Sequence, residues 1–554
     1  MRSLLLTTFA GCLLLACNDG SGPGDGPSLV CTDGSTEALS VGEHRVLNPL
    51  QNDACVRLPP PPGAGAEHLY VPVATEGAEA EDGVSAPYAL NGSAPATASA
   101  PAPTSARLSA FRQAQPAETF HDMLRQRERA LAGSPSRVLF DKAPVASVSS
   151  VPPVPGEQRT FDVCTSRQCN AFTQATATAK AVGQRVAIFV DNAAPAGGYS
   201  DADLAQVGTL FDDYLYPIDT TAFGRESDVD GNAVVIVLLT HRVNELSPNC
   251  NTTGSVILGY FFGADLLPRS TGNPGSNEAE IFYGLVPDPS NVNCDISQEF
   301  ARSRLPATFI HEFQHMISFN QHVLVRNGRS EDTWLNEGLS HLAEELGGRQ
   351  IPAAECPVSG SCSRDFIQGD LENALDYLTS PEDFFLIEPG SSSGELAERG
   401  ANWLFVRWLA DQFATDTLLG TDLTRRLVAT SLTGAANVQA VTGQTLQELI
   451  PEWQLANYVD DLPGFQASSP RLRYKTWNFR AAADSIARAF PLVPDVTNGV
   501  GYSHAGVLRA GSGRHVLITQ PGAASSVNLQ LTSPSGQEPV ASSVQPRIAL
   551  VRIR

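Results

Sequence analysis

Positive charge is scarce in this chain of 554 residues. Lys and Arg together number 37 against 59 Asp and Glu, so the formal net charge is −22. A chain with this charge repels the phosphate backbone of nucleic acids and anionic membrane surfaces, and no basic stretch in the sequence reverses the balance. The composition therefore excludes nucleic acid from the expected partners.

Long apolar runs are absent after the start of the chain. The run from Leu4 to Ala16 follows Arg2 and is too short to cross a bilayer, which is typical of an export signal. It ends in Leu-Leu-Ala before Cys17, and this ending resembles the lipobox of bacterial lipoproteins. The resemblance implies that residues 1–17 are a signal peptide and that lipid on Cys17 is the sole membrane anchor; an ordinary signal peptide cut elsewhere is the alternative. We therefore expect a protein of the bacterial cell envelope (outer membrane, periplasm or cell surface) or one released outside the cell.

No pair of cysteines has the CxxC spacing, which argues against a cysteine-rich zinc site. Apart from Cys12 and Cys17, which fall in the signal region, eight cysteines remain. An even number in an exported chain favours four disulfides. The sequence does not fix their pairing, and bonds between sequence neighbours are the simplest arrangement: Cys31–Cys55, Cys164–Cys169, Cys250–Cys294 and Cys356–Cys362.

The chain is too long for a single core, and its composition changes several times along its length. We expect a tether over residues 18–35, a small β module over 36–95, and a Pro/Ala-rich linker with one short helix over 96–157. No internal repeat of solenoid length occurs. A catalytic domain is expected over 158–465 and a C-terminal β domain over 466–554.

The pattern within residues 158–465 indicates strands followed by helices. Apolar, β-branched runs such as RVAIFVD and AVVIVLLT have the length of buried strands, and the segment from Ser200 that lies between them has helical spacing. From Pro306 to about Tyr458 the pattern is mostly helical. This segregation is typical of an α+β fold, here a mixed sheet followed by helices and flanked by small β-rich modules.

The sequence HEFQH at 311–315 lies in the segment LPATFIHEFQHMIS, which has helical apolar spacing and in which Pro306 suits the first turn. Positions four apart share a helix face, so His311 and His315 can each give one nitrogen to a tetrahedral Zn²⁺. Glu312 lies beside them, where it can act as a general base. A helix with polar or buried histidines and no metal is the alternative, because such short motifs often occur by chance.

A catalytic zinc site of this kind needs a third protein ligand. The pattern HExxHxxGxxH fails here, because Ser318 and Gln321 stand where its Gly and third His belong. Downstream, DTWLNEGLSHLAEEL at 332–346 has a leucine stripe of helical spacing and carries Glu337, 22 residues past His315. This separation suits a second helix packed antiparallel on the first, which lets Glu337 reach the metal and leaves the fourth position to water.

The pairing of HEFQHMI with WLNEGLSHLAEE resembles the gluzincin metallopeptidases, and most closely the hyicolysin family. The resemblance extends over roughly residues 158–460. It implies a zincin-like catalytic domain, one catalytic Zn²⁺ and a protein or peptide substrate. By it, His311, His315 and Glu337 would ligate zinc, and Glu312 would be the catalytic base.

One position departs from the gluzincin pattern. Many members carry an Asp four residues after the glutamate ligand, where this chain has His341. Glu344 is seven residues after Glu337 and shares its helix face, so it could orient a zinc-bound histidine, or it could be an ordinary solvated charge. His341 could donate a hydrogen bond to the oxyanion of the transition state.

Two weaker predictions concern the strand region. Asp228, Asp230 and Asn232 alternate in SDVDGN like the first ligands of a Ca²⁺ loop, although no glutamate follows at the twelfth position and an ordinary DG turn is the simpler interpretation. The strand AEIFYGL at 279–285 is a candidate edge for binding a substrate peptide, or it is an interior strand.

The sequence thus predicts an exported zinc-dependent endopeptidase in which Glu312 activates a water molecule. The alternative is a lipid-anchored surface-binding or adhesin-like protein that keeps the zincin fold without peptidase activity. An intact Glu312 favours the enzyme, since a purely structural zinc needs no base.

Overall fold

The structure is a computed structural model that describes residues 34–92, 116–133 and 151–554, except for residues 52, 53, 62, 64, 357–359, 393, 417 and 418. The expected signal peptide, Cys17 and Cys31 lie outside the described residues. Within the described ranges, every helix is too short or too polar to span a membrane.

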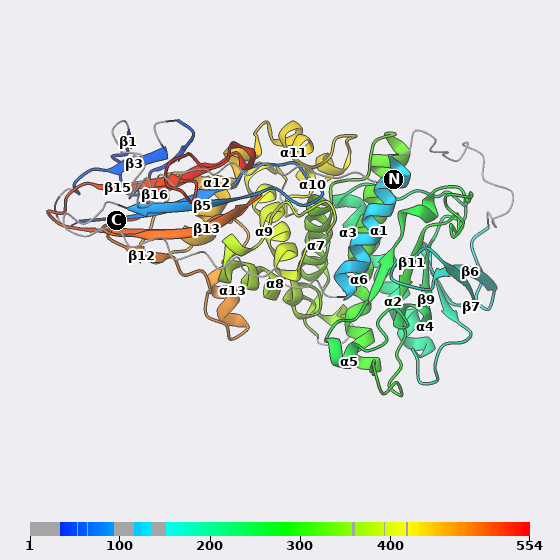
Figure 1. Cartoon of the computed structure of the whole chain (residues 1–554). Coiled ribbons are helices and arrows are strands. Elements are labelled where there is room, and N and C mark those ends of the chain that lie inside the picture. Colours follow the sequence, from blue (N-terminus) through cyan, green and yellow to red (C-terminus); the bar gives the residue numbers. More distant parts are fainter. Residues whose placement is uncertain are drawn as a thin grey trace, which may run out of the picture.

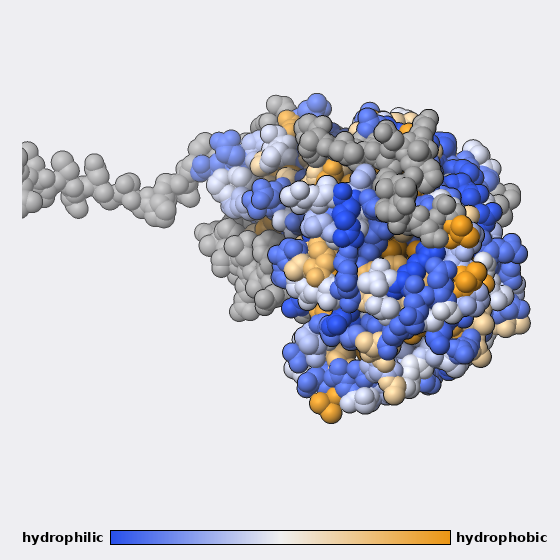
Figure 2. Space-filling view, turned by 90° about the vertical axis from the view of Figure 1, so that its right-hand side faces the viewer, coloured by the Kyte–Doolittle hydropathy of each residue, from blue (hydrophilic) through white to orange (hydrophobic). Residues whose placement is uncertain are grey.

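The molecule is elongated, with a β-sandwich at one end, helices in the middle and a second sheet at the other end (Figure 1). Strands and helices are segregated, which confirms the predicted α+β class. The end of the molecule that carries this second sheet presents a mostly hydrophilic face, on which hydrophobic residues form small separate groups (Figure 2).

The sheet at the end of the molecule opposite the β-sandwich is mixed and has six strands in the order β10-β11-β9-β8-β7-β6. Strands β8, β9 and β11 are parallel, whereas β10, β7 and β6 pair antiparallel with their neighbours. The candidate edge strand at 279–285 corresponds to β11, which is an interior strand; β10 and β6 form the two edges. The strands are β6 (Gln158–Cys164), β7 (Phe172–Val182), β8 (Val186–Asp191), β9 (Val235–Leu239), β10 (Gly259–Phe261) and β11 (Ile281–Gly284).

Helices pack on this sheet and fill the middle of the molecule. In α6 (Gln298–Phe319), Phe309 stacks on Phe282 of β11 with 5.1 Å between ring centroids. α7 (Thr333–Gln350) packs on α6, α9 (Leu396–Phe413) packs on α7, and α8 (Gln368–Thr379) packs on α9; one buried apolar cluster runs through all four. The other α-helices are α1 (Pro116–Ala132), α2 (Asp201–Leu210), α3 (Tyr216–Ala222), α4 (His241–Asn244), α5 (Cys250–Thr253), α10 (Thr421–Val428), α11 (Gly434–Thr442), α12 (Leu446–Val459) and α13 (Phe479–Ser485).

The sandwich is built from segments far apart in the sequence. Its two sheets have the orders β1-β3-β15-β5-β13 and β12-β14-β4-β16-β2, and their inner faces share one core. The strands expected in two separate modules, at 36–95 and 466–554, therefore belong to one unit. Apolar alternation predicts a strand but does not say which distant strand it pairs with. The strands are β1 (Ser35–Thr36), β2 (His44–Leu47), β3 (Cys55–Leu58), β4 (Gly65–Val73), β5 (Ser85–Gly92), β12 (Asp495–Thr497), β13 (Ser503–Arg509), β14 (Val516–Pro521), β15 (Val527–Thr532) and β16 (Arg547–Arg552).

Gly400 sets how closely α9 packs on α8. A Cβ at this position would lie 2.3 Å from the backbone carbon of Asn373 and 2.4 Å from the backbone nitrogen of Ala374. We expect Gly400→Ala to lower the free energy of unfolding by about 1–3 kcal/mol in urea denaturation, because α8 has to move away. Gly369→Ala in α8 is the matched control, since a Cβ there meets nothing within 4 Å. Equal losses for the two variants would contradict this packing role.

Candidate metal centre

Helix α6 carries the HEFQH sequence in its second half. It begins at Gln298, where the hydroxyl of Ser297 accepts the backbone N–H of Phe300 at 3.1 Å. The predicted first-turn position of Pro306 is wrong, because Pro306 lies inside the helix. The helix starts earlier because Ser297 supplies a cap and its hydroxyl satisfies one of the unpaired N–H groups of the first turn.

Helix α7 carries Glu337 in its second turn. The predicted leucine stripe on this helix is fully buried. Beside Glu337, a Cβ on Gly338 would lie 2.8 Å from the carbonyl oxygen of Asn402, so the glycine permits close contact with α9. The helix is thus held between α6 and α9, which fixes the position of Glu337. The stripe consists of Leu335, Leu339, Leu342 and Leu346.

The side chains of His311, His315 and Glu337 converge at one buried point. Glu337 Oε2 lies 3.5 Å from His311 Nε2, and Glu337 Oε1 lies 3.6 Å from His315 Nε2. One ligand-type atom of each residue lies within 4.8 Å of the others. Two imidazoles and one carboxylate at this spacing form a donor set that catalytic zinc takes.

The electrostatics of this point also fit a divalent metal. Burial alone would raise the pKa of Glu337, but Arg399, His315 and His311 hold it well below its ordinary value. Burial lowers the pKa of His315 well below its ordinary value, which keeps a lone pair for coordination. Burial also acts to lower the pKa of His311, yet Glu337 and Glu344 raise it to about 10, so a positive charge is favoured here. Among the described residues, the buried Oε2 of Glu337 has no hydrogen-bond partner.

Glu312 lies beside the converging side chains and is 2% exposed. Its Oε2 accepts the backbone N–H of Phe261 in β10 at 2.8 Å, and its Oε1 is 4.0 Å from Nδ1 of His121 in α1. Burial raises the pKa of Glu312, although His311 and Arg125 oppose the rise. A carboxylate with a raised pKa is suited to accept a proton near neutral pH.

Hydrogen bonds on the outer side of His311 lead to α8. Glu344 Oε1 is 2.8 Å from His311 Nδ1 and 3.1 Å from His341 Nδ1, so Glu344 contacts a histidine of the site and is not a freely solvated charge. His341 Nδ1 is also 2.8 Å from Oδ1 of Asp370. Within the described part of the chain, His341 Nε2 has no hydrogen-bond partner.

Besides His121, three residues near the site were not assigned to it from the sequence. Ser340 Oγ is 3.0 Å from His315 Nδ1, and its place one turn after Glu337 is a signal that helical spacing carries. Asp370 and Arg399 come from other helices, and Arg399 lies 3.8 Å from Glu337. No motif or spacing marks these two, since only tertiary packing brings them to the site.

A second cluster of ligand-type residues lies before the parallel strands β9 and β11. Asp228, Asp230 and Glu280 each place one carboxylate oxygen within 4.8 Å of the others. Asn232, predicted as a ligand, uses its side-chain oxygen to accept the N–H of Val234 at 2.8 Å. Burial raises the pKa of Asp230 to about 7 and that of Glu280 to about 8. Glu280 was not predicted because it lies 50 residues from Asp230.

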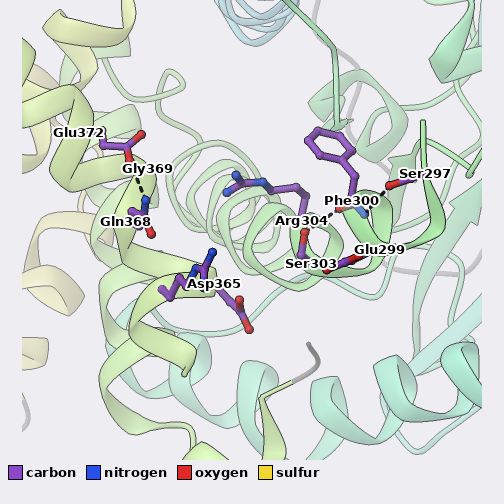
Figure 3. A pocket seen from close by; sticks show the side chains of 10 residues that line it. Ser297, Glu299, Phe300, Ser303, Arg304, Asp365, Gln368, Gly369 and Glu372 are labelled. Carbon is purple, nitrogen blue, oxygen red and sulfur yellow. Dashed lines mark hydrogen bonds between the residues drawn. The ribbon is translucent and has the colours of Figure 1, made fainter. Parts of the chain in front are cut away.

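A cavity of about 440 Å³ opens between the first turns of α6 and the start of α8. Its lining is polar, with Arg304 pointing into it from α6 and Asp365 and Glu372 on the other side (Figure 3). Arg304 precedes His311 by seven residues, or about two helical turns. The two residues therefore share a face of α6, and the lining of the cavity includes none of the converging side chains.

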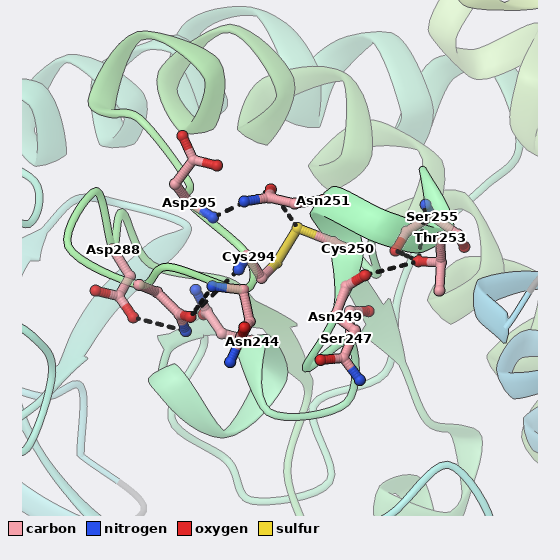
Figure 4. The surroundings of a disulfide bond; sticks show 12 residues. Asn244, Ser247, Asn249, Cys250, Asn251, Thr253, Ser255, Asp288, Cys294 and Asp295 are labelled. Carbon is pink, nitrogen blue, oxygen red and sulfur yellow. Dashed lines mark hydrogen bonds between the residues drawn. A yellow bond between two sulfur atoms is a disulfide. The ribbon is translucent and has the colours of Figure 1, made fainter.

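Three of the four predicted disulfides are confirmed, and Cys31, a partner in the fourth, lies outside the described residues. The Cys250–Cys294 bond closes a loop of 44 residues and joins α5 to the segment that enters α6 (Figure 4). Closing a loop of this length restricts the unfolded chain and so favours the folded state. The confirmed bonds are Cys164–Cys169, Cys250–Cys294 and Cys356–Cys362.

Comparison with known proteins gives one informative similarity. No protein-family model matches the chain. Over 153 residues the chain is 31% identical to "Neutral metalloprotease ShpI" of Staphylococcus hyicus, a match that covers 26% of this chain and 31% of that protein. The chain spans only about a third of the length of this curated relative. The similarity therefore supports only a general class of activity, namely metal-dependent hydrolysis of peptide bonds.

Proposed function

We propose that the chain is an exported zinc-dependent endopeptidase with its catalytic domain within residues 158–465. The observation that carries the proposal is the convergence of His311, His315 and Glu337 on one buried point with Glu312 beside it. The partial similarity to a metalloprotease supports the same class of activity. Disulfides favour an oxidising compartment and therefore export, while the lipid on Cys17 stays a prediction.

Glu312 is the general base of the proposed reaction. A zinc ion held by the two histidines and Glu337 would polarise the scissile carbonyl and lower the pKa of the attacking water. Glu312 takes a proton from this water and passes it to the leaving amine. His341 is held through Nδ1 by Glu344 and Asp370, so its Nε2 faces no protein partner among the described residues and can donate to the oxyanion.

Metal analysis combined with a protease assay tests this proposal. We expect one zinc per chain, and hydrolysis of denatured casein that a chelator stops and added Zn²⁺ restores. Absence of stoichiometric zinc overturns the proposal. One zinc per chain without hydrolysis, both in the wild type and in Phe120→Ala/Arg125→Ala, also overturns it and supports instead the surface-binding protein with a zincin fold.

Glu344 should tune the affinity for zinc without being a ligand. In Glu344→Ala, His311 loses the carboxylate that fixes its ring, so we expect zinc affinity to fall about 10–100-fold in titrations against a competing chelator. Glu344→Gln is the matched control, because its side-chain oxygen can still accept from His311 Nδ1 and should preserve most of the affinity. Unchanged affinity in the alanine variant would contradict this orienting role.

We also propose a Ca²⁺ site at Asp228, Asp230 and Glu280. Calcium takes carboxylate oxygens. Glu280 is 2% exposed, one of its carboxylate oxygens lies within 4.8 Å of an oxygen of each aspartate, and in the described residues its Oε2 has no hydrogen-bond partner. Its other oxygen accepts from Val229 N–H at 2.9 Å, which holds the side chain to the loop. Glu280 thus takes the part of the glutamate that the loop sequence lacks.

Calcium should stabilise the protein through this site. At about 100 times its Kd, a ligand of the folded state adds about 2.7 kcal/mol, which we expect to see as a higher Tm. Glu280→Gln keeps an oxygen for Val229 but removes the charge, so most of the calcium-dependent shift should disappear. Asp213→Asn, at an exposed position, is the control. A shift of equal size in Glu280→Gln would rule out this site.

A further inference from the structure

The β10 edge of the mixed sheet is hydrogen-bonded to side chains of the same chain. In edge strand β10, the carbonyl of Phe261 accepts from the Arg125 guanidinium at 2.7 Å, and the N–H of Phe261 donates to Glu312 at 2.8 Å. Just after the strand, the N–H of Gly263 donates to Glu128 at 2.6 Å. These bonds take up the backbone groups of Phe261 and Gly263, which the edge would otherwise offer to an added strand.

Arg125 and Glu128 both come from α1, which meets α6 where His121 lies 4.0 Å from Glu312. They are 4% and 2% exposed and lie 3.2 Å apart, so this is a buried ion pair docked on the sheet edge. Phe120 of the same helix is fully buried and meets the ring of Tyr260 in β10 edge-on, with 5.0 Å between ring centroids. The helix therefore binds β10 by apolar, charged and backbone contacts together.

The same helix also reaches the proposed base. His121 Nδ1 lies 4.0 Å from one oxygen of Glu312, while the other oxygen of Glu312 is held by Phe261. A substrate needs this carboxylate to face its scissile bond and the attacking water. With α1 in place, the two oxygens face a histidine and the sheet edge instead.

A peptide substrate and α1 compete for the same groups. Extended peptides bind to proteins by adding a strand to an exposed sheet edge, where backbone groups supply the hydrogen bonds. At this edge two such groups are the carbonyl of Phe261 and, just after β10, the N–H of Gly263, and both already bond to α1. A peptide cannot use them until α1 has left.

We propose that α1 is an intramolecular inhibitor: its docking surface is the outer edge of β10 beside Glu312, and peptide cleavage requires its displacement. This inference rests on the proposed peptidase function. It adds to that function a latent state in which zinc ligands and base are assembled while the substrate edge is covered.

The test compares full-length chains that differ only in α1. In Phe120→Ala/Arg125→Ala, helix docking is weakened, so a larger fraction of molecules exposes β10. We expect the apparent KM for a casein-derived peptide to fall about tenfold or more while kcat changes less than about twofold, because an internal competitor is removed. Gln126→Ala, on the exposed side of α1, is the matched control and should resemble the wild type.

Further measurements distinguish weaker docking of α1 from misfolding of the double variant. Zinc content and circular dichroism show whether the double variant is folded, and Glu128→Gln offers a milder change at the same surface. A synthetic peptide of residues 116–133, added at up to millimolar concentration, should inhibit the double variant competitively, and the same peptide with Arg125→Ala should inhibit less.

The outcomes separate this inference from the proposed function. An unchanged KM in folded, zinc-loaded variants, or no inhibition by the peptide, overturns the inhibitory role of α1. If the wild type then still hydrolyses peptide and needs Glu312 to do so, the peptidase proposal stands alone. If none of the chains hydrolyses peptide, both fall.

Discussion

Replacing Glu312 with Gln should lower peptide hydrolysis by about 10²–10⁴-fold and leave zinc bound. The amide has nearly the shape of the carboxylate, and its oxygen can still accept the N–H of Phe261, so the site keeps its structure. What is lost is the ability to take a proton from water and to return it to the leaving amine. Zinc content should not change, because Glu312 is not among the three converging ligands.

This prediction is measured as kcat/KM on a casein-derived peptide together with zinc content. The assay is best run in the wild type and in Phe120→Ala/Arg125→Ala, which offers a wider range of rates if α1 inhibits. Glu299→Gln, at an exposed position in the first turn of the same helix, is the matched control. If Glu312→Gln hydrolyses the peptide at the rate of the control, another group is the base.

Replacing Glu337 with Ala should remove both zinc and activity. Loss of a partner that merely orients a ligand weakens metal binding by about 10–100-fold, so loss of a direct ligand should exceed that range. The two histidines would remain, but a pair of imidazoles on one helix leaves half of a tetrahedral site open to water. We expect less than stoichiometric zinc after dialysis and no hydrolysis at micromolar Zn²⁺.

The control for this change is Glu372→Ala, an exposed glutamate of α8. Thermal unfolding of each variant without metal separates a loss of zinc from a loss of fold, because removal of the buried Glu337 also changes the charge balance near Arg399. Stoichiometric zinc of unchanged affinity in the folded Glu337→Ala chain would mean that the third ligand lies elsewhere.

The part of the site that the sequence predicted is the part encoded by helical spacing. His311 and His315 lie one turn apart, and Glu337 follows on the next α-helix, so their convergence needs two helices and a short connection. Asp370 and Glu280 depend instead on how distant segments pack. A short sequence pattern cannot express contacts of that kind.

In the fold, too, the features set by local sequence were predicted and those set by contacts between distant segments were not. The apolar runs of the mixed sheet were found as strands. For the strand at 279–285 the sequence left an edge and an interior position open, and the structure has it inside the sheet next to the edge strand β10. Pro306 was interpreted as a start signal, and the cap at Ser297 was overlooked. Local preferences identify elements well, while sheet order and true helix ends depend on competition among several acceptable partners.

The sandwich has a consequence for the order in which the chain folds. β4 lies between β14 and β16, which are synthesised more than 400 residues later. Leu69, Val71 and Val73 of β4 are fully buried in the finished protein, so a growing chain carries an unpaired apolar strand for most of its synthesis. Pairings between such distant segments form slowly and leave strands open to aggregation until they close. Completion of the sandwich is therefore a late event. A chain whose synthesis stops before β14 has two incomplete sheets with unpaired apolar strands, and we expect it to aggregate.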